Sequence, residues 1–245
     1  FIFMFYIVGI GLEKEDISLK ALEALKRCEE IYIEKYTTPL PYSIKEYRKF
    51  ISKILNKKII IKEAKRSLLE ENSEEFIKKA KNKNIALLVY GDPLIATTHI
   101  ALIKEARKKG IKYKIIHNCS VFNAIADFGL SMYKFGKIAS MPKWEKGYEP
   151  ESFYKIIEEN KSIDAHTLLL IDPNLNFNDC IKQLKKVDRE KKIKDFFVCS
   201  MLGTKNQKVF KFNLEKIKIK EIKKIKEIKK PFCFIIPSSL SFYEN

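Results

Sequence analysis

IALLVYGDP, from Ile85 to Pro93, is a six-residue apolar run followed by glycine, aspartate and proline. A short apolar run bounded in this way predicts a buried strand of a parallel sheet. A helical pattern from Ile100 to Lys109, closed by Gly110, follows it. We therefore expect Asp92 at the carboxyl end of a parallel strand, where open α/β sheets bind their ligands. A simple turn aspartate is the alternative, because Asp before Pro also favours a turn.

Apolar strand patterns and amphipathic helix patterns alternate through the first half of the chain. Such alternation predicts a parallel sheet covered by helices. Glu75, three residues after Asn72, completes the sequence of a capping box and predicts a helix start there. The expected strands are Phe5–Gly9, Ile31–Ile33, Ile85–Tyr90 and Tyr113–His117, and the expected helices begin at Ser18 and span Ser43–Asn56, Asn72–Asn82 and Ile100–Lys109.

The second half predicts a different kind of sheet. Extended segments follow one another there without an intervening helix, which favours a mixed or partly antiparallel arrangement. The expected strands are Thr167–Asp172, Phe196–Leu202, Val209–Phe212 and Phe232–Ile236, and the expected helices cover residues 121–128, 150–159 and 178–187. We therefore predict an α/β protein with two α/β domains, residues 1–117 and 118–245, and a cleft between them.

The composition describes a globular protein with an excess of positive charge. The 245 residues carry 48 basic and 31 acidic side chains, for a net charge of +17. Only 5 of the basic residues are Arg, whereas base and phosphate recognition relies on the guanidinium fork, so specific nucleic-acid binding is disfavoured. A Lys-rich surface can still steer an acidic protein partner. The opening apolar run, Phe1–Val8, is too short to cross a membrane.

The usual catalytic and metal-binding constellations are absent from the sequence. Its five cysteines are scattered, without a C-x-x-C pair or a histidine at ligand spacing, which predicts reduced thiols, a cytoplasmic location and no metal. Nucleophile-elbow, zincin and Walker sequences are also missing. A structural role is favoured for His99, His117 and His166, which lie next to strand or helix ends. An enzyme with this sequence would work mainly by positioning its reactants.

Gly9-Ile10-Gly11 follows the first expected strand, as it would in a dinucleotide-binding protein. The third glycine of that motif is replaced by Lys14, and the acidic residues from Glu13 to Asp16 would repel a pyrophosphate. The pattern therefore favours either a tight turn beside a neutral or cationic ligand, or a plain turn between strand and helix.

A set of motifs occurs in one order along the chain and resembles a known family. The motifs are YIVGIGL (Tyr6–Leu12), DISLKAL (Asp16–Leu22), EKYTT (Glu34–Thr38), GDP with ATTH (Gly91–Pro93 and Ala96–His99), HNCSVFNA (His117–Ala124), PESFY (Pro150–Tyr154) and HTLLLID (His166–Asp172). This set resembles the diphthine synthases, which are S-adenosylmethionine-dependent methyltransferases with a tetrapyrrole methylase-like fold. The resemblance runs from Met4 to Glu244 and is most specific in its first two thirds.

The resemblance implies a reaction, a cofactor and a set of contacts. The reaction is methylation of the amino group of a 3-amino-3-carboxypropyl histidine on translation elongation factor 2, a step of diphthamide biosynthesis. The family further implies a homodimer that needs no metal and binds S-adenosylmethionine between its two domains, with S-adenosylhomocysteine as the product. By match to the family motifs, cofactor contacts are implied for Leu12, Asp92, Ile95, Ser120, Val121, Ile171, Leu202 and Phe232, and acceptor contacts for Tyr36, Thr37 and Thr38 in the loop from Glu34.

The chain departs from the family pattern near its end. The family has Ala-Arg-Ala-Gly, Pro-His and Leu-His where this chain has Ser200-Met201-Leu202-Gly203, Pro231-Phe232 and Leu240-Ser241. Contacts made through main-chain groups would survive these changes, whereas a chemical role of the histidines would not.

Two alternatives to this interpretation remain at the level of sequence. One is a tetrapyrrole (precorrin-type) methyltransferase of the same fold, and the other is a non-enzymatic basic protein that docks to ribosomal components. Within the favoured interpretation no general base is identified, and Tyr36, Thr38 and His117 are candidates only.

Overall fold

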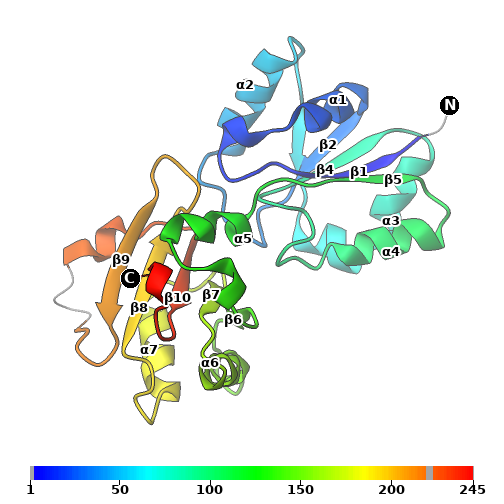
Figure 1. Ribbon diagram of the computed structural model, residues 1–245. Helices are drawn as coiled ribbons and strands as arrows, with labels where there is room; N and C mark the ends of the chain where they lie inside the picture. The colour runs from blue at the N-terminus through cyan, green and yellow to red at the C-terminus, as the bar shows by residue number, and fades with distance from the viewer. Residues whose placement is uncertain (1–2, 219–222, 245) are drawn as a thin grey trace. The chain divides into compact units, whose positions relative to one another are not determined.

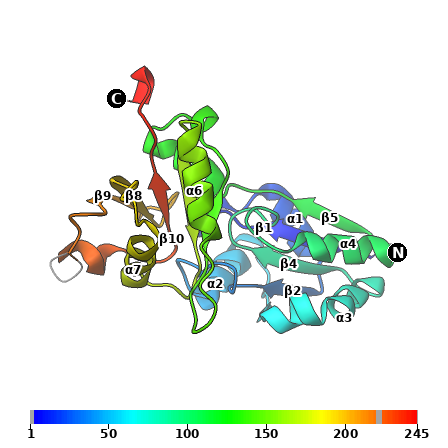
Figure 2. The same cartoon turned by 90° about the horizontal axis from the view of Figure 1, so that it is seen from below.

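The computed structural model describes residues 3–218 and 223–244. The chain forms two compact units, Phe1–Ala124 and Ile125–Asn245 (Figures 1 and 2). Each unit contains one five-stranded sheet with helices packed against it. The predicted α/β class is therefore confirmed.

The units divide after Ala124, whereas the sequence predicted a boundary after His117. The difference arises because the intervening segment is bonded to the first unit. Asn118 Nδ2 donates to the carbonyl oxygen of Gly9 at 3.1 Å and to that of Asp16 at 2.9 Å. These bonds hold Asn118 against the end of the first strand and the turn that follows it.

The first unit contains a fully parallel sheet with the strand order β3-β2-β4-β1-β5. All five residues of β4 are buried, which explains why this strand is an uninterrupted apolar run. The sequence did not predict β3, a three-residue strand at the edge of the sheet. The strands are β1 (Phe5–Gly9), β2 (Glu30–Ile33), β3 (Ile61–Glu63), β4 (Ile85–Val89) and β5 (Tyr113–Ile116).

Two helices cover each face of this sheet (Figure 1). Leu25 of α1 and Tyr47 of α2 share a core with Val8, while Phe76 of α3 and Leu102 of α4 pack on the opposite face. Serine caps fix two of the starts, since the side chain before α1 accepts from Ala21 N and the one before α2 from Glu46 N. The helices are α1 (Leu19–Arg27), α2 (Ile44–Ile54), α3 (Ser73–Lys78) and α4 (Ile100–Lys108).

The helix start predicted at Asn72 is confirmed, because α3 begins at Ser73, but the predicted capping box is wrong. A π-helical turn over Ser67–Glu71 ends at Asn72, which has a φ of −111° and a ψ of 30° rather than the extended conformation of an N-cap. Its Nδ2 atom donates instead to the Ser67 carbonyl oxygen. The helix predicted as far as Asn82 also ends earlier, because α3 gives way to a 3₁₀ turn over Lys79–Lys81.

The second unit contains the predicted mixed sheet, with the strand order β6-β7-β10-β8-β9. The pair β6 and β7 is parallel, and the other three pairs are antiparallel. Phe153 of α6 and Leu184 of α7 pack into one core with Phe196 and Phe234 of the strands. The elements are β6 (Ala139–Met141), which was not predicted, α6 (Ser152–Ser162), β7 (Thr167–Ile171), α7 (Phe177–Val187), β8 (Asp195–Ser200), β9 (Lys208–Asn213) and β10 (Phe232–Ile236).

The helix predicted over residues 121–128 is shorter than expected. The α-helical part, α5, covers Val121–Ala124, and a 3₁₀ turn over Ile125–Phe128 follows it. The division between the two units falls between these two turns. In the described parts of the chain, no helix combines the length and the apolar character that a membrane span requires.

Candidate functional site

The carboxyl edge of the first unit's sheet gathers most of the predicted site residues. Because all its strands are parallel, their carboxyl ends lie at one edge. The segments that leave β2, β4, β1 and β5 there begin at Glu34, Tyr90, Ile10 and His117. Motifs that are far apart in the sequence therefore meet at this edge.

Glycines allow the turns after β1 and β4 to approach each other closely. Gly11 N donates to Gly91 O at 3.2 Å, and Gly91 N donates to Gly11 O at 2.9 Å. Both residues have positive φ, of 75° and 72°, a conformation that favours glycine. A Cβ atom on Gly9 would lie only 2.6 Å from Gly91 O. This close contact, rather than a phosphate cradle, accounts for the two glycines near residue 10.

Asp16 occupies the main-chain donors that a phosphate would need. Its Oδ2 accepts from Leu12 N at 2.9 Å and from Glu13 N at 2.8 Å. The turn after β1 therefore binds its own carboxylate, in line with the prediction that no pyrophosphate binds here. Since its N–H is used, Leu12 has only its carbonyl group and side chain to offer a ligand.

Asp92 lies at the centre of the edge and is 4% exposed. Its Oδ1 accepts from Leu94 N at 2.9 Å, as in an Asx turn, and its Oδ2 accepts from Asn118 N at 3.2 Å. Oδ2 also lies 2.8 Å from His117 Nδ1, and the His117 side chain is 66% exposed. Asp92 is thus a turn residue that also joins the ends of β4 and β5, with an exposed imidazole beside it.

The segments after Asp92 and His117 carry the other predicted contacts in this unit. No hydrogen bond in the described residues uses the main-chain groups of Ile95. Ala96, which follows it, has a φ of 56°, a conformation that residues other than glycine rarely adopt. Ser120 is buried, and its Oγ accepts from Phe122 N at the start of α5, where Val121 is the first residue.

The predicted acceptor loop after β2 is held by a buried carboxylate. Glu34 is 1% exposed, and its Oε2 accepts from Tyr36 N at 3.0 Å and from Thr37 N at 3.1 Å. Thr37 Oγ1 donates to Glu34 Oε1 at 2.5 Å. These bonds fix the backbone of the loop, and Thr38 follows as a half-buried residue.

Tyr36 contacts a histidine that sequence reasoning assigned only a structural role. Tyr36 Oη lies 3.5 Å from His99 Nε2, and His99 is 1% exposed. Burial raises the pKa of Tyr36, and the neighbouring charge of Glu34 adds to this effect. Burial lowers the pKa of His99, against the opposing influence of Glu34. Only the motif ATTH, in which the histidine follows the Asp92 turn closely, could have suggested this pairing.

Of the three histidines, His166 fits the structural prediction. It is completely buried, its Nδ1 accepts from Ser238 N at 2.9 Å, and its Nε2 lies 3.0 Å from Glu244 Oε1. These bonds tie the last described segment to the sheet of the second unit.

The three predicted contacts of the second unit lie on neighbouring strands. The register pairs Phe232 with Ser200, and Cys233 with Leu170. The carboxyl ends of β7 and β8 therefore lie on either side of the amino end of β10. Ile171 and Phe232 are half-buried at this edge, and Leu202 is buried just beyond β8. This group is apolar, in contrast to the carboxyl edge of the first unit.

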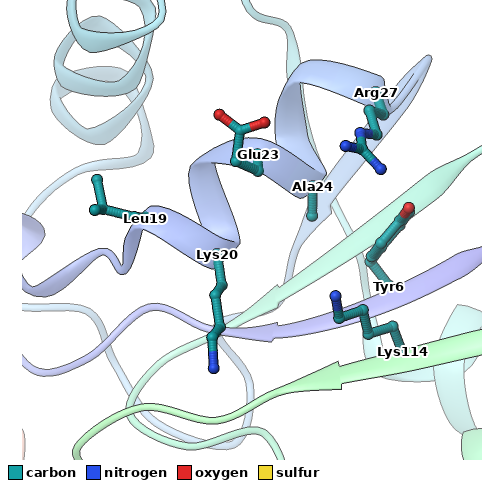
Figure 3. A pocket seen from close by; sticks show the side chains of 7 residues that line it. All are labelled: Tyr6, Leu19, Lys20, Glu23, Ala24, Arg27 and Lys114. Atoms are coloured by element: carbon teal, nitrogen blue, oxygen red, sulfur yellow. The ribbon is translucent and has the colours of Figure 1, made fainter.

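A surface pocket of about 250 Å³ lies elsewhere in the first unit, between α1 and the edge strand β5 (Figure 3). Tyr6 and Lys114, the second residues of β1 and β5, mark its position away from the carboxyl edge. None of the predicted site residues lines it. Its lining residues are Tyr6, Leu19, Lys20, Glu23, Ala24, Arg27 and Lys114. In the described residues no cluster of three or more His, Cys, Asp or Glu could hold a metal ion.

Comparison with known proteins agrees with the fold. Residues 4–218 match the family described as tetrapyrrole (corrin/porphyrin) methylases. A crystal structure of diphthine synthase aligns with a TM-score of 0.84 at 34% identity, covering 98% of this chain and 92% of that one. The chain belongs to the tetrapyrrole methylase family. Within that family, the resemblance to the diphthine synthases is confirmed.

Curated relatives carry two related names. Diphthine methyl ester synthase of Schizosaccharomyces pombe is 42% identical over 170 residues, which are 69% of this chain and 58% of that protein. Diphthine synthase of Archaeoglobus fulgidus is 44% identical over 171 residues, which are 69% of this chain and 64% of that protein. The matched region thus spans less than two thirds of the length of either relative.

Proposed function

We propose that this chain is an S-adenosylmethionine-dependent methyltransferase of diphthamide biosynthesis. Its acceptor is the amino group of the 3-amino-3-carboxypropyl histidine on translation elongation factor 2. The observation that carries the proposal is the meeting of Leu12, Asp92, Ile95, Ser120 and Val121 at one edge of a parallel sheet, in a chain that is similar to diphthine synthases. Three separate stretches of the sequence supply these residues.

The polar groups at the carboxyl edge of the first unit's sheet are suited to binding S-adenosylmethionine. A carboxylate offers about four lone-pair sites, and three donors of the protein contact that of Asp92. One further hydroxyl can therefore bind, and the exposed His117 ring can be displaced by a ligand. The unused main-chain groups of Ile95 are suited to a heterocycle edge, and the negative charge of Asp92 suits a cationic sulfonium. The strained φ of Ala96 is typical of a functional turn.

The second unit would supply apolar contacts to the same cofactor. We propose these contacts for Ile171, Leu202 and Phe232, which lie on adjacent strands. They would be made by main-chain groups or by apolar side chains, so the loss of the family's histidines in this region does not remove them. The predicted cleft between the units stays a prediction.

The reaction needs alignment more than it needs a catalytic group. When bound, S-adenosylmethionine supplies a methyl group that is already activated by its sulfonium sulfur. The protein must hold the acceptor nitrogen in line with that carbon and exclude water. An alkyl amine has a reference pKa of roughly 8 to 10, so it must lose a proton first, which a partly desolvated site favours.

The loop after β2 is proposed to hold the acceptor. Glu34 fixes the loop backbone, which leaves the side chains of Tyr36, Thr37 and Thr38 at the edge next to β4. The raised pKa of Tyr36 keeps its hydroxyl protonated at neutral pH. Tyr36 is therefore suited to hydrogen bonding with the amine rather than to removing its proton.

We further propose that the protein works in the cytoplasm as a homodimer, with the elongation factor as its protein partner and without specific nucleic-acid binding. The family resemblance supports the dimer. The small number of arginines supports the last point. Sedimentation equilibrium of the purified chain tests the dimer, for which we expect twice the mass of 28.7 kDa.

Incubation with labelled S-adenosylmethionine tests the proposed function. The chain is mixed with elongation factor 2 that carries either the 3-amino-3-carboxypropyl group or an unmodified histidine. We expect label only on the modified factor, and mass spectrometry of that factor counts the methyl groups and shows whether the carboxylate is esterified. Label on a tetrapyrrole instead would favour the alternative methyltransferase, and failure to bind the cofactor at all would favour the non-enzymatic protein.

A further inference from the structure

His99 is a buried histidine whose side chain has no role in the proposed contacts so far. It directly precedes α4 and is 1% exposed. Its ring meets that of Tyr36 edge to face, with centroids 6.2 Å apart and an angle of 70° between the planes. Its Nε2 atom lies 3.5 Å from Tyr36 Oη, a distance that can shorten when a substrate binds.

The protonation states of His99 and Tyr36 decide which side chain donates the hydrogen bond and which accepts it. Burial lowers the pKa of His99, so the ring is neutral at neutral pH and has one nitrogen that accepts. Nδ1 has no hydrogen-bond partner in the described residues, and the main chain of Pro93 acts against the lowering of the ring's pKa. A proton on Nδ1 leaves the lone pair of Nε2 for the hydroxyl group of Tyr36, which is itself protonated.

Charged groups surround this pair on every side that packs against it. Glu34 lies on the segment after β2 and acts on both His99 and Tyr36. Arg66 lies 5.7 Å from the centroid of the Tyr36 ring, and its Nε donates to Glu70 Oε2. Glu70 Oε1 accepts from Thr98 Oγ1 at 3.0 Å, next to His99. Glu70 also interacts with the Tyr36 hydroxyl group and raises its pKa, so this carboxylate and His99 Nε2 compete for the hydroxyl proton.

We propose that His99 is a positioning residue for the acceptor amine, an inference that rests on the proposed function. His99 Nε2 accepts the hydroxyl proton of Tyr36, and the lone pairs of the Tyr36 oxygen then face the acceptor. An oxygen oriented in this way can only accept, so it binds an N–H of the neutral amine. The nitrogen lone pair is thereby left free to point toward the methyl group.

Substitutions at the two positions test the proposal. His99→Leu removes the acceptor nitrogen, whereas His99→Gln can place a carbonyl oxygen close to the position of Nε2. Tyr36→Phe removes the hydroxyl group. Tyr113→Phe is the matched control, because Tyr113 lies on the outer strand β5 and its Oη accepts from Arg107 Nε of α4. Thermal melting and S-adenosylmethionine affinity are measured for each variant, to confirm the fold and the cofactor site.

We expect kcat/KM for the modified factor to fall by about tenfold in both His99→Leu and Tyr36→Phe. The double variant should lose no more than either single variant, because both remove the same hydrogen bond. His99→Gln should retain activity to within about threefold. In the wild type, kcat/KM should fall on the acid side as His99 becomes protonated, at a pH below the usual histidine pKa of about 6.5. This fall should be absent in His99→Gln.

The NMR signal of Tyr36 Cζ gives an independent readout in the protein without substrate. It should shift in His99→Leu and return toward the wild-type position in His99→Gln. A shift with unchanged kcat/KM would overturn the proposal, because the bond would then be structural only. Additive losses in the double variant would also overturn it. If the wild-type chain binds the cofactor but labels no factor, the proposed function fails and the inference falls with it.

Discussion

Both units contain a strand that ends in Asp-Pro, and the two turns differ in what surrounds them. Asp92 follows β4 and Asp172 follows β7. Each carboxylate accepts from the main-chain N–H two residues on, Leu94 at 2.9 Å and Asn174 at 2.7 Å. Asp92 is buried and its second oxygen also joins the end of β5, whereas Asp172 is half-exposed. The local sequence produces the turn in both units, but only the turn at Asp92 belongs to a candidate site.

The neighbouring strands explain this difference. β4 lies between β2 and β1, both parallel to it, so its turn is surrounded by other turns that leave the same edge. β7 has the antiparallel β10 on one side and the parallel β6 on the other, so only one of its two neighbours sends a turn out at the edge where Asp172 lies. A carboxylate at a strand end becomes a binding group when topology surrounds it with polar main chain.

Removal of each carboxylate is the strongest test of this comparison. We expect Asp92→Ala to weaken S-adenosylmethionine binding by about 1 to 3 kcal/mol, which is roughly 5- to 150-fold. Asp172→Ala should change the affinity by less than about twofold, because a half-exposed turn contact contributes little. Isothermal titration calorimetry measures both. Equal affinities for the two variants would reduce Asp92 to a turn residue.

A substitution at the close contact between the two turns of the first unit is expected to have a smaller effect on cofactor binding. A Cβ atom on Gly9 would lie 2.6 Å from Gly91 O and 2.9 Å from Pro93 Cδ. Gly9→Ala should therefore lower the free energy of unfolding by about 2 kcal/mol, as overpacking does, and weaken cofactor binding. Gly110→Ala is the control, since its Cβ would meet no atom within 4 Å and only its positive φ opposes the change.

Urea unfolding and cofactor titration separate the two glycine variants. The expectation for Gly110→Ala is a cost of about 1 kcal/mol with unchanged cofactor affinity. If Gly9→Ala lowered stability without affecting cofactor affinity, the packing of the turns would be unrelated to the site.

The second unit contains a buried carboxylate whose role is expected to be structural, in contrast to that of Asp92. Main-chain N–H groups of Ser241 and Ser131 bind Glu244 and lower its pKa to about 2. Because the folded pKa lies below the unfolded value, this stabilisation is present above about pH 4.5 and is lost as the pH falls toward 2. Glu244→Gln should cost about 1 kcal/mol near neutral pH.

Melting temperature measured against pH tests the role of Glu244. The gap between wild type and Glu244→Gln should close over that acidic window, while cofactor affinity stays unchanged. Glu159→Gln is a control, because Glu159 forms an exposed ion pair with Lys137. A gap that persisted at low pH would mean that the glutamine variant loses packing rather than charge.

The sequence predicted every strand of four or more residues in the described parts of the chain and missed the two strands of three residues. β4 is an unbroken apolar run, and its position and its parallel pairing were both predicted. β3 and β6 have three residues each, too few to show a period. At Asn72 the preceding π-helical turn sets the backbone, and no local pattern contains that information.

The site was predictable to a similar extent. Motif spacing indicated which turns carry polar groups, and the parallel sheet brought Leu12, Asp92 and Ser120 to one edge. The partners of those groups depend on the three-dimensional arrangement. Asp16 binding the turn after β1, and His99 contacting Tyr36, are long-range or backbone-dependent contacts that periodicity does not predict.

The smallest expected effect concerns the basic pocket of the first unit (Figure 3). Lys20 and Lys114 line it, and Lys182 of α7 is an exposed lysine of the second unit. If the first unit binds the acidic partner, Lys20→Glu and Lys114→Glu should each slow association with the elongation factor by about threefold at low salt. Lys182→Glu changes the net charge equally and should slow it by less than about twofold.

Stopped-flow association at increasing salt distinguishes a local contribution from the field of the whole protein. Raising the ionic strength should slow the wild type and bring all three variants to the same rate, because exposed charges are screened over about 10 Å at 0.1 M salt. If Lys182→Glu slowed association as much as the other two, the net charge of +17 would steer the partner without regard to the unit that carries it. A rate that did not depend on salt would exclude steering by either unit, and the recognition of the factor would then depend on the contacts of the loop from Glu34 alone.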